Sequence, residues 1–213
     1  ITDFAGIANV VTDPGVFCVK ADSPMKTLED LIAAAKAAPG KIAVSHEGAG
    51  SGDHLGVMEF CKKAGIEVNP VPFEGDAPAK AALLGGHIDV LAVNVSEIAE
   101  MVNTGQLRAL AVQNDKRSAE LPDVPTFAEL GYPTVIQGTA SRGFAAPKDI
   151  PAEALDVLVN AMKKIVASTE YREELKKLNM PIDFVPGGEF TKLLLDQHKL
   201  WSELWETDPW LKK

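Results

Sequence analysis

The sequence is short of positive charge and has no long apolar run. It carries 21 Lys and Arg against 30 Asp and Glu, a net charge of −9. This balance argues against a nucleic-acid binder and against a basic patch for a membrane surface. Because no run of some eighteen apolar residues occurs, no segment is expected to span a membrane.

Cysteine and histidine are also scarce, and their spacing excludes the common metal sites. The two cysteines, Cys18 and Cys61, form no C-x-x-C motif, and no two of the four histidines stand at metal-ligand spacing. We expect each cysteine to be a small buried apolar side chain. A disulfide between them stays open, because it requires a strand and a helix to pack side by side.

The glycine-rich residues 48–52 are similar to two catalytic motifs but satisfy neither. A nucleophile elbow requires Gly two positions before and after its serine, and around Ser51 those positions hold Ala49 and Asp53. A dinucleotide-binding fingerprint requires a third Gly where Asp53 stands. We therefore expect no catalytic residue, no metal and no cofactor, and we predict that the protein is not an enzyme.

What the sequence does have is an alternation of short β-branched runs with helical patterns. Its 213 residues, 46% of them hydrophobic, suffice for one large domain or two small ones. The alternation is typical of an α/β protein with mainly parallel strands. Strands are expected at residues 16–19, 41–45, 68–71, 88–93, 107–112, 141–145 and 182–185, and helices at 28–38, 53–64, 77–84, 94–102, 126–130, 151–167, 170–178 and 188–206.

Three strand-to-helix junctions carry residues suited to binding a small anion. Glycines let the backbone approach a ligand, and the helix that follows offers unpaired N–H groups. Such a neutral, donor-rich wall binds a carboxylate without a dedicated cation, which suits a negatively charged chain. The alternative is that the glycines only form turns and that Ser51 and Asn94 only cap helices. The candidates are Ala49, Gly50, Ser51, Gly52, Phe73, Gly75, Asp76 and Asn94.

Several longer motifs follow one another in order across most of residues 15–150. They are Ala21-Asp22-Ser23-Pro24, Gly48-Ala49-Gly50-Ser51, Val71-Pro72-Phe73-Glu74-Gly75, Leu84-Gly85-Gly86-His87-Ile88-Asp89-Val90, Gly105-Gln106-Leu107-Arg108-Ala109-Leu110 and Leu121-Pro122-Asp123-Val124-Pro125. With these stretches the chain resembles the extracytoplasmic solute receptors of tripartite tricarboxylate transporters. An ordered series of this length is more specific than any single motif.

The resemblance implies an α/β fold of two lobes, the type II periplasmic binding protein-like fold, with mixed, mainly parallel sheets flanked by helices. Residues 1–18 would form the end of lobe 1 and the first crossing, residues 19–140 a complete lobe 2, and residues 141–213 the return to lobe 1. Family members carry a further segment before the position of Ile1. The resemblance therefore implies that lobe 1 is incomplete here and that one ligand-binding loop is missing.

Several positions depart from the family pattern. Phe73 lacks the hydroxyl of the family's Tyr, Glu74 replaces a Lys, and Asp76 places a negative charge at a helix start. Asp76 either caps its helix or faces an ammonium or hydroxyl group of the ligand. On the return segment the family often has Trp before Gly, where this chain has Ser141 and Arg142. We expect both Ser141 and Arg142 to bind the ligand. Arg142 would grip a ligand carboxylate as a bidentate fork, with a surface or inter-lobe salt bridge as the alternative.

These observations predict a periplasmic or otherwise extracytoplasmic receptor, free or lipid-anchored through the missing N-terminus. It would capture a small mono-, di- or tricarboxylate, amino acids included, and deliver it to membrane transporter subunits, with no nucleic-acid partner. One alternative is the ligand-sensing lobe of a cytoplasmic transcriptional regulator with the same fold. Another is an α/β enzyme such as a transferase, which would need a nucleophile or base in the cleft.

Overall fold

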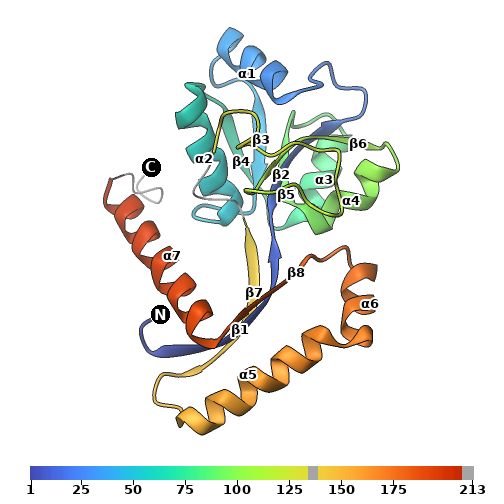
Figure 1. Ribbon diagram of the computed structural model, residues 1–213. Coiled ribbons are helices and arrows are strands. Elements are labelled where there is room, and N and C mark those ends of the chain that lie inside the picture. Colours follow the sequence, from blue (N-terminus) through green and yellow to red (C-terminus); the bar gives the residue numbers. More distant parts are fainter. Residues whose placement is uncertain (134–138, 208–213) are drawn as a thin grey trace. The chain divides into compact units, whose positions relative to one another are not determined.

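The computed structural model describes residues 1–133 and 139–207 of the chain, which divides into two compact units (Figure 1). Unit 1 consists of Ile1–Thr12 and of the chain from Ser141 onward, and unit 2 consists of Asp13–Ala140. Within the described residues, no helix combines the length and apolar character that crossing a membrane requires.

The elements of both units alternate as the sequence pattern predicted, with one strand added before the first expected one. Unit 1 holds that added strand, β1 (Phe4–Asp13), and then β7 (Ala140–Pro147), α5 (Ala152–Ala167), α6 (Thr169–Lys177), β8 (Ile182–Pro186) and α7 (Gly187–Thr207). Unit 2 holds β2 (Gly15–Lys20), α1 (Leu28–Ala37), β3 (Ala43–His46), α2 (Gly52–Ala64), β4 (Asn69–Pro72), α3 (Asp76–Leu84), β5 (Leu91–Asn94), α4 (Val95–Asn103) and β6 (Leu107–Gln113).

The first boundary between the units differs from the one expected at residue 18. β2 lies between β5 and β6 in one sheet, bonded to both neighbours. A strand whose backbone groups are satisfied on both sides by one sheet belongs to that sheet. Residues 13–18, which the sequence analysis assigned to the end of lobe 1 and the first crossing, lie in unit 2.

The strands of unit 2 run mainly in one direction, and β2 is the exception. β3 and β4 pair in parallel, and a parallel bridge joins Val44 of β3 to Val90 beside β5. β2 is antiparallel to both β5 and β6. Because β5 and β6 oppose the same strand, they are parallel to each other. The carboxyl ends of β3, β4, β5 and β6 therefore reach the same edge of unit 2.

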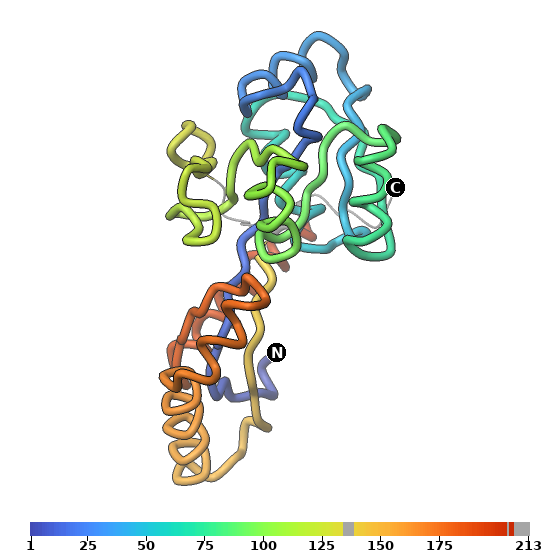
Figure 2. Tube along the Cα trace, turned by 90° about the vertical axis from the view of Figure 1, so that its right-hand side faces the viewer, coloured from blue at the N-terminus to red at the C-terminus, as the bar shows by residue number. Residues whose placement is uncertain are grey.

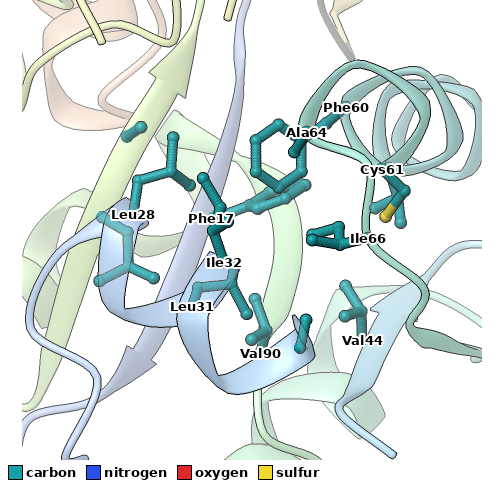
Figure 3. Close-up of a cluster of buried hydrophobic side chains, with 14 of the residues drawn as sticks. Phe17, Leu28, Leu31, Ile32, Val44, Phe60, Cys61, Ala64, Ile66 and Val90 are labelled. Carbon is teal, nitrogen blue, oxygen red and sulfur yellow. The ribbon is translucent and has the colours of Figure 1, made fainter. Parts of the chain in front are cut away.

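Helices cover both faces of β2, and its side chains alternate between the two layers. Phe17 and Val19 belong to a core built with α1 and α2, which Figure 3 shows in close-up. Val16 and Cys18 point into the other core, built with α3 and α4. β2 is thus the shared wall of two hydrophobic cores.

The two cysteines lie in different cores and are free. Cys18 lies in the core with α3 and α4, whereas Cys61 lies in the core with α1 and α2. Both are buried, as expected for small apolar side chains. A disulfide is excluded because β2 separates the two layers.

The expected short helix after Thr126 is a turn, and this prediction was wrong. Its capping motif does form, because Thr126 N–H donates to the Glu129 carboxylate at 2.7 Å and Glu129 N–H donates to Thr126 Oγ1 at 3.1 Å. The backbone around it is tied to β6, however, since Val112 N–H donates to Pro125 O and Phe127 N–H donates to Val112 O. These bonds hold the segment as an extra edge of the sheet.

Unit 1 is built on the sheet β7-β1-β8. β1 is antiparallel to β8, with Ala8 opposite Pro186, and both α5 and α7 contact β8. Figure 1 shows α5 leading into α6 through a sharp change of direction, and Figure 2 shows the same two helices turned by 90°. Ser168 makes this corner with extended backbone, and its Oγ accepts from Tyr171 N–H at 3.3 Å to begin α6.

The contact between β1 and α7 predicts a penalty for any side chain at Gly6. A Cβ there would lie 2.9 Å from the Thr191 backbone nitrogen and 2.9 Å from the Phe190 ring. We expect Gly6→Ala to lower the free energy of unfolding in urea by about 1–3 kcal/mol through overpacking. In the control Gly188→Ala a Cβ meets nothing within 4 Å, so stability should hold or rise slightly. Equal losses in the two variants would contradict this account.

Candidate functional site

The carboxyl-end edge of unit 2 gathers three loops and the start of β2. β3 ends at His46, β4 at Pro72 and β5 at Asn94. Gly15, the first residue of β2, lies opposite both Asn94 and Gln113. Open α/β sheets bind their ligands beyond the carboxyl ends of the strands, so this edge is the candidate site of unit 2.

The loop between β3 and α2 presents backbone at a helix N-terminus. Gly48 and Gly50 have φ angles of +104° and +82°, a region that only glycine enters readily. Ser51 N–H donates to Gly48 O at 3.2 Å, and Ser51 Oγ accepts from His54 N–H at 3.2 Å, which caps α2. Ala49 at the tip is exposed. A helix start of this kind suits an anion.

Two histidine side chains hold the same loop. Gly48 N–H donates to Nδ1 of His46 and Gly50 N–H donates to Nδ1 of His54, each at 3.1 Å. The two buried rings lie against each other, with centroids 4.5 Å apart and planes inclined by 30°. An Nδ1 atom that accepts carries no proton, so each neutral ring has its proton on Nε2. Burial lowers the pKa of His46 below its usual value.

The N-terminus of α4 already holds a carboxylate of the protein itself. Asp13 is fully buried, and its carboxylate accepts from Ser96 N–H at 3.1 Å and from Ser96 Oγ at 2.5 Å. The Asn94 amide donates to Asp13 O at 3.0 Å, and Asn94 N–H donates to Glu97 at 3.0 Å. A negative charge at a helix start is favourable. Asp13 therefore takes the place that an anion would have at α4, and Asn94 ties this helix to the start of β2.

The loop between β4 and α3 is held against β3. Phe73 N–H donates to His46 O at 2.9 Å, and the Phe73 side chain packs against the core with α3 and α4. Gly75, with φ of +101°, precedes α3 without a side-chain cap. Asp76 pairs with Lys80 of its own helix at 2.5 Å, and this hydrogen bond lowers the pKa of the Asp76 carboxyl. Asp76 is thus paired within α3.

Comparison with known proteins shows which family the chain belongs to. Residues 1–207 match the family described as the tripartite tricarboxylate transporter family receptor. The chain belongs to this receptor family. Its fold is that of the family's periplasmic binding proteins, as the sequence motifs implied.

The relatives match most of this chain, and they are longer than it is. A Cupriavidus necator protein, named for the gbd 5′ region, is 39% identical over 181 residues, which are 85% of this chain and 54% of that protein. A ligand-free crystal structure of a solute-binding protein from Polaromonas has a TM-score of 0.84 at 35% identity, covering 96% of this chain and 70% of the other. The periplasmic binding protein BugD has a TM-score of 0.79 at 26% identity, covering 97% and 70%. The chain thus spans about half the length of the curated relatives it matches.

The expected site residues of the receptor fall into two groups. The first group lies at the edge described above. It comprises the loop at residues 48–52, the candidates between Phe73 and Asp76, and Asn94. Ser141 and Arg142 lie instead on β7 of unit 1, where Ser141 is exposed and Arg142 half-buried.

The edge also holds carboxyl groups that the neutral wall predicted from the sequence did not include. Burial raises the pKa of the Asp53 carboxyl to about 8, and the charges of Glu47, Glu97 and Asp13 raise it further in that direction. Burial also raises the pKa of Glu97 to about 7. Since a carboxyl with a pKa of about 8 is mostly protonated at neutral pH, Asp53 adds a hydroxyl donor there rather than a full charge.

Sequence reasoning missed Asp13, Asp53, Glu97 and His46 as members of the site. Asp53 drew notice only because it breaks the catalytic motifs, although its place in the first turn of α2 put it at the candidate loop. Glu97 follows Asn94 by three residues, which is capping-box spacing and was a usable signal. Asp13 offered none, because the residues that it contacts lie 83 positions along the chain.

Gln113 adds a buried amide to this edge. Only 1% of the residue is exposed, and no partner for its Nε2 occurs among residues 1–133 and 139–207. The amide lies against α2, where a Cβ at Gly56 would be 2.8 Å from Nε2. A buried donor left unsatisfied costs about 1–3 kcal/mol, so we expect a water or ligand acceptor at this position.

The burial of Asp53 predicts a stability that falls as the pH rises. The unfolded carboxyl ionises near its ordinary pKa of 3.8, whereas the folded one keeps its proton until about pH 8. Between these values the folded state binds more protons, so the free energy of unfolding decreases with pH. The side chain in Asp53→Asn cannot ionise, so the free energy of unfolding of this variant should decline less between about pH 5 and pH 8, by on the order of a few kcal/mol. Melting temperatures measured across this pH range report the difference.

The exposed Asp123→Asn is the matched control and should keep the wild-type decline. Glu97 also changes the free energy of unfolding in this pH range, but it is present in every variant. The difference between Asp53→Asn and Asp123→Asn therefore reports on Asp53. An Asp53→Asn protein whose melting temperature follows the wild-type curve at each pH would show that this carboxyl is not buried as described.

Proposed function

We propose that the chain is the ligand-binding part of a periplasmic receptor that captures a small carboxylate and delivers it to a tripartite tricarboxylate-type membrane transporter. The observation that carries the proposal is the loop at residues 48–52, where glycines at positive φ present backbone at the start of α2. A helix N-terminus with unpaired N–H groups is an anion-binding site in its own right.

Two structural relatives support a carboxylate as the ligand. One protein from R. palustris has adipate in its structure, and MatC from Rhodopseudomonas palustris has bound malate. At 24% and 22% identity they share the fold with this chain. Small dicarboxylates are therefore the first compounds to test.

The protonation of Asp53 reconciles an anionic ligand with the acidic edge. Near neutral pH the Asp53 carboxyl is mostly protonated, because burial raises its pKa to about 8. A protonated carboxyl donates a hydrogen bond, as unpaired backbone N–H groups at a helix start do. Affinity for a carboxylate should accordingly weaken as the pH rises through about 8, when Asp53 acquires its charge.

Arg142 is the cation that we assign to the ligand. It lies half-buried on β7 of unit 1, and a guanidinium can grip a carboxylate with two parallel N–H bonds. Ser141 beside it is exposed and supplies a hydroxyl.

The proposed activity includes no catalytic step. The family and the fold are those of solute receptors, and a receptor needs donors that a wrong ligand leaves unpaired rather than a nucleophile. The alternative of a sensing lobe in a transcriptional regulator gains no support from the family match, which names a transporter receptor.

The proposal is tested by thermal denaturation of the full-length protein with malate and with adipate. A ligand that binds only the folded state raises the melting temperature, and at 100 times its Kd it adds about 2.7 kcal/mol. We expect at least one of the two dicarboxylates, and no monoamine, to raise the melting temperature by several degrees. A folded protein that responds to neither compound, nor to other mono- and tricarboxylates, would remove the carboxylate proposal.

Two matched pairs of variants test the site itself. Gly48→Ala strains the loop at φ +104° without a clash, and Gly131→Ala applies similar strain at φ +87°, also with open space around it. Arg142→Ala is matched by Arg172→Ala, an exposed arginine of unit 1. The ligand-induced shift should be lost in Gly48→Ala and Arg142→Ala and kept in both controls. If all four keep it, the receptor function stands and our site is wrong.

A further inference from the structure

The loop at residues 48–52 depends on two side chains that the ligand proposal does not use. His46 is the last residue of β3 and His54 lies in the first turn of α2, so they approach the loop from its two ends. Each accepts a backbone N–H of the loop at Nδ1, from Gly48 and Gly50 at 3.1 Å. Both N–H groups belong to glycines at positive φ, where the backbone has most freedom to move.

This bonding pattern exists only while both imidazoles are neutral. Protonation of an imidazole turns Nδ1 from an acceptor into a donor, which would set N–H against N–H at Gly48 or Gly50. The rings also lie with centroids 4.5 Å apart, so two positive charges there would repel each other. Each protonation therefore removes one loop bond, and the second also meets the charge of the first.

We propose that His46 and His54 are positioning residues that clamp the loop at residues 48–52 in its ligand-ready form while they are neutral and release it when they are protonated. The clamp concerns the loop alone, and only its effect on affinity rests on the proposed carboxylate function. Neither imidazole has to touch the ligand.

The charges around the two rings decide where the release occurs. Glu47 and Asp53 lie next to the two histidines in the chain, and the charges of Glu47, of Asp13 at the end of β1 and of Glu97 on α4 act on the Asp53 carboxyl. On α3, Asp76 and Lys80 neutralise each other.

Burial lowers the pKa of His46 and so opposes its protonation. Because Asp53 keeps its proton up to about pH 8, it adds little charge where histidine titrates. Release is therefore expected on the acid side of the ordinary histidine range.

Nuclear magnetic resonance tests the clamp without any ligand. In the full-length protein at about pH 7.5, long-range nitrogen–proton spectra should show both rings with their proton on Nε2. The amides of Gly48 and Gly50 should be protected from solvent exchange, and their protection, corrected for intrinsic rates, should fall about tenfold by about pH 5. Rings protonated on Nδ1 at about pH 7.5, or protection that does not change with pH, would overturn the proposal.

Conservative variants separate the clamp from simple packing. In His46→Asn and His54→Asn the amide oxygen stands close to the Nδ1 position and can accept the same bond, but it cannot titrate. These variants should keep glycine protection at about pH 5, where wild type loses it. His46→Gln and His54→Gln place their amide near Nε2 and should lose protection at every pH. His198→Asn, on the surface of α7, should behave as wild type.

A binding titration then links the clamp to function. With malate as the probe, wild-type affinity should fall roughly tenfold between about pH 7.5 and pH 5, and His46→Asn should fall less. A pH-dependent glycine protection with no malate binding would keep the clamp and count against the proposed ligand. Malate affinity that stays constant while glycine protection is lost would disprove the link between the loop and the ligand.

Discussion

The insertion of β2 between β5 and β6 is the constraint on which unit 2 depends. Its side chains alternate between two cores, so a shift of one residue in its register would exchange the two sets of contacts. The same register sets Gly15 opposite Asn94 and Gln113. Asp13, two residues before the start of β2, is thereby brought to the start of α4. The hydrophobic pairing of one strand thus decides which polar groups meet at the functional edge.

Asp13 also decides which helix remains open to a ligand. Helix starts attract negative charge, and α4 satisfies this preference internally, through the bonds from Ser96 to Asp13. At α3, Asp76 stands in the first turn and pairs with Lys80 of the same helix. α2 differs, because the carboxyl in its first turn, Asp53, is kept mostly protonated by burial. Of the three helix starts at this edge, α2 is therefore the one whose positive end is not already offset by a charged side chain of the protein.

The sequence predicted features whose causes lie close together in the chain, and it failed where distant segments interact. α1 begins after Thr27 as its capping box with Asp30 indicated, and both bonds of the box are present. The same motif at Thr126 formed its bonds but no helix, because β6 holds the backbone before it. β1 was missed since Asn9 interrupts its apolar run, yet Asn9 is buried and donates to Thr12 and Asp183. The glycine loop was found from composition, whereas the tautomers of the histidines that hold it depend on geometry that no spacing rule contains.

The chemistry at this edge is that of neutral groups whose protonation is set by burial. Desolvation disfavours whichever form is charged, so it keeps a proton on Asp53 and removes one from His46. The first effect supplies a donor, and the second supplies an acceptor that fixes the loop. Neutral Asp53 and neutral His46 coexist only in a limited pH range. It lies above the pH at which the histidines are protonated and release the loop, and below about pH 8, where Asp53 ionises. A protein of net charge −9 cannot attract an anion through its overall field. Within that range it can still offer one a local surface of hydrogen-bond donors that carries little charge of its own.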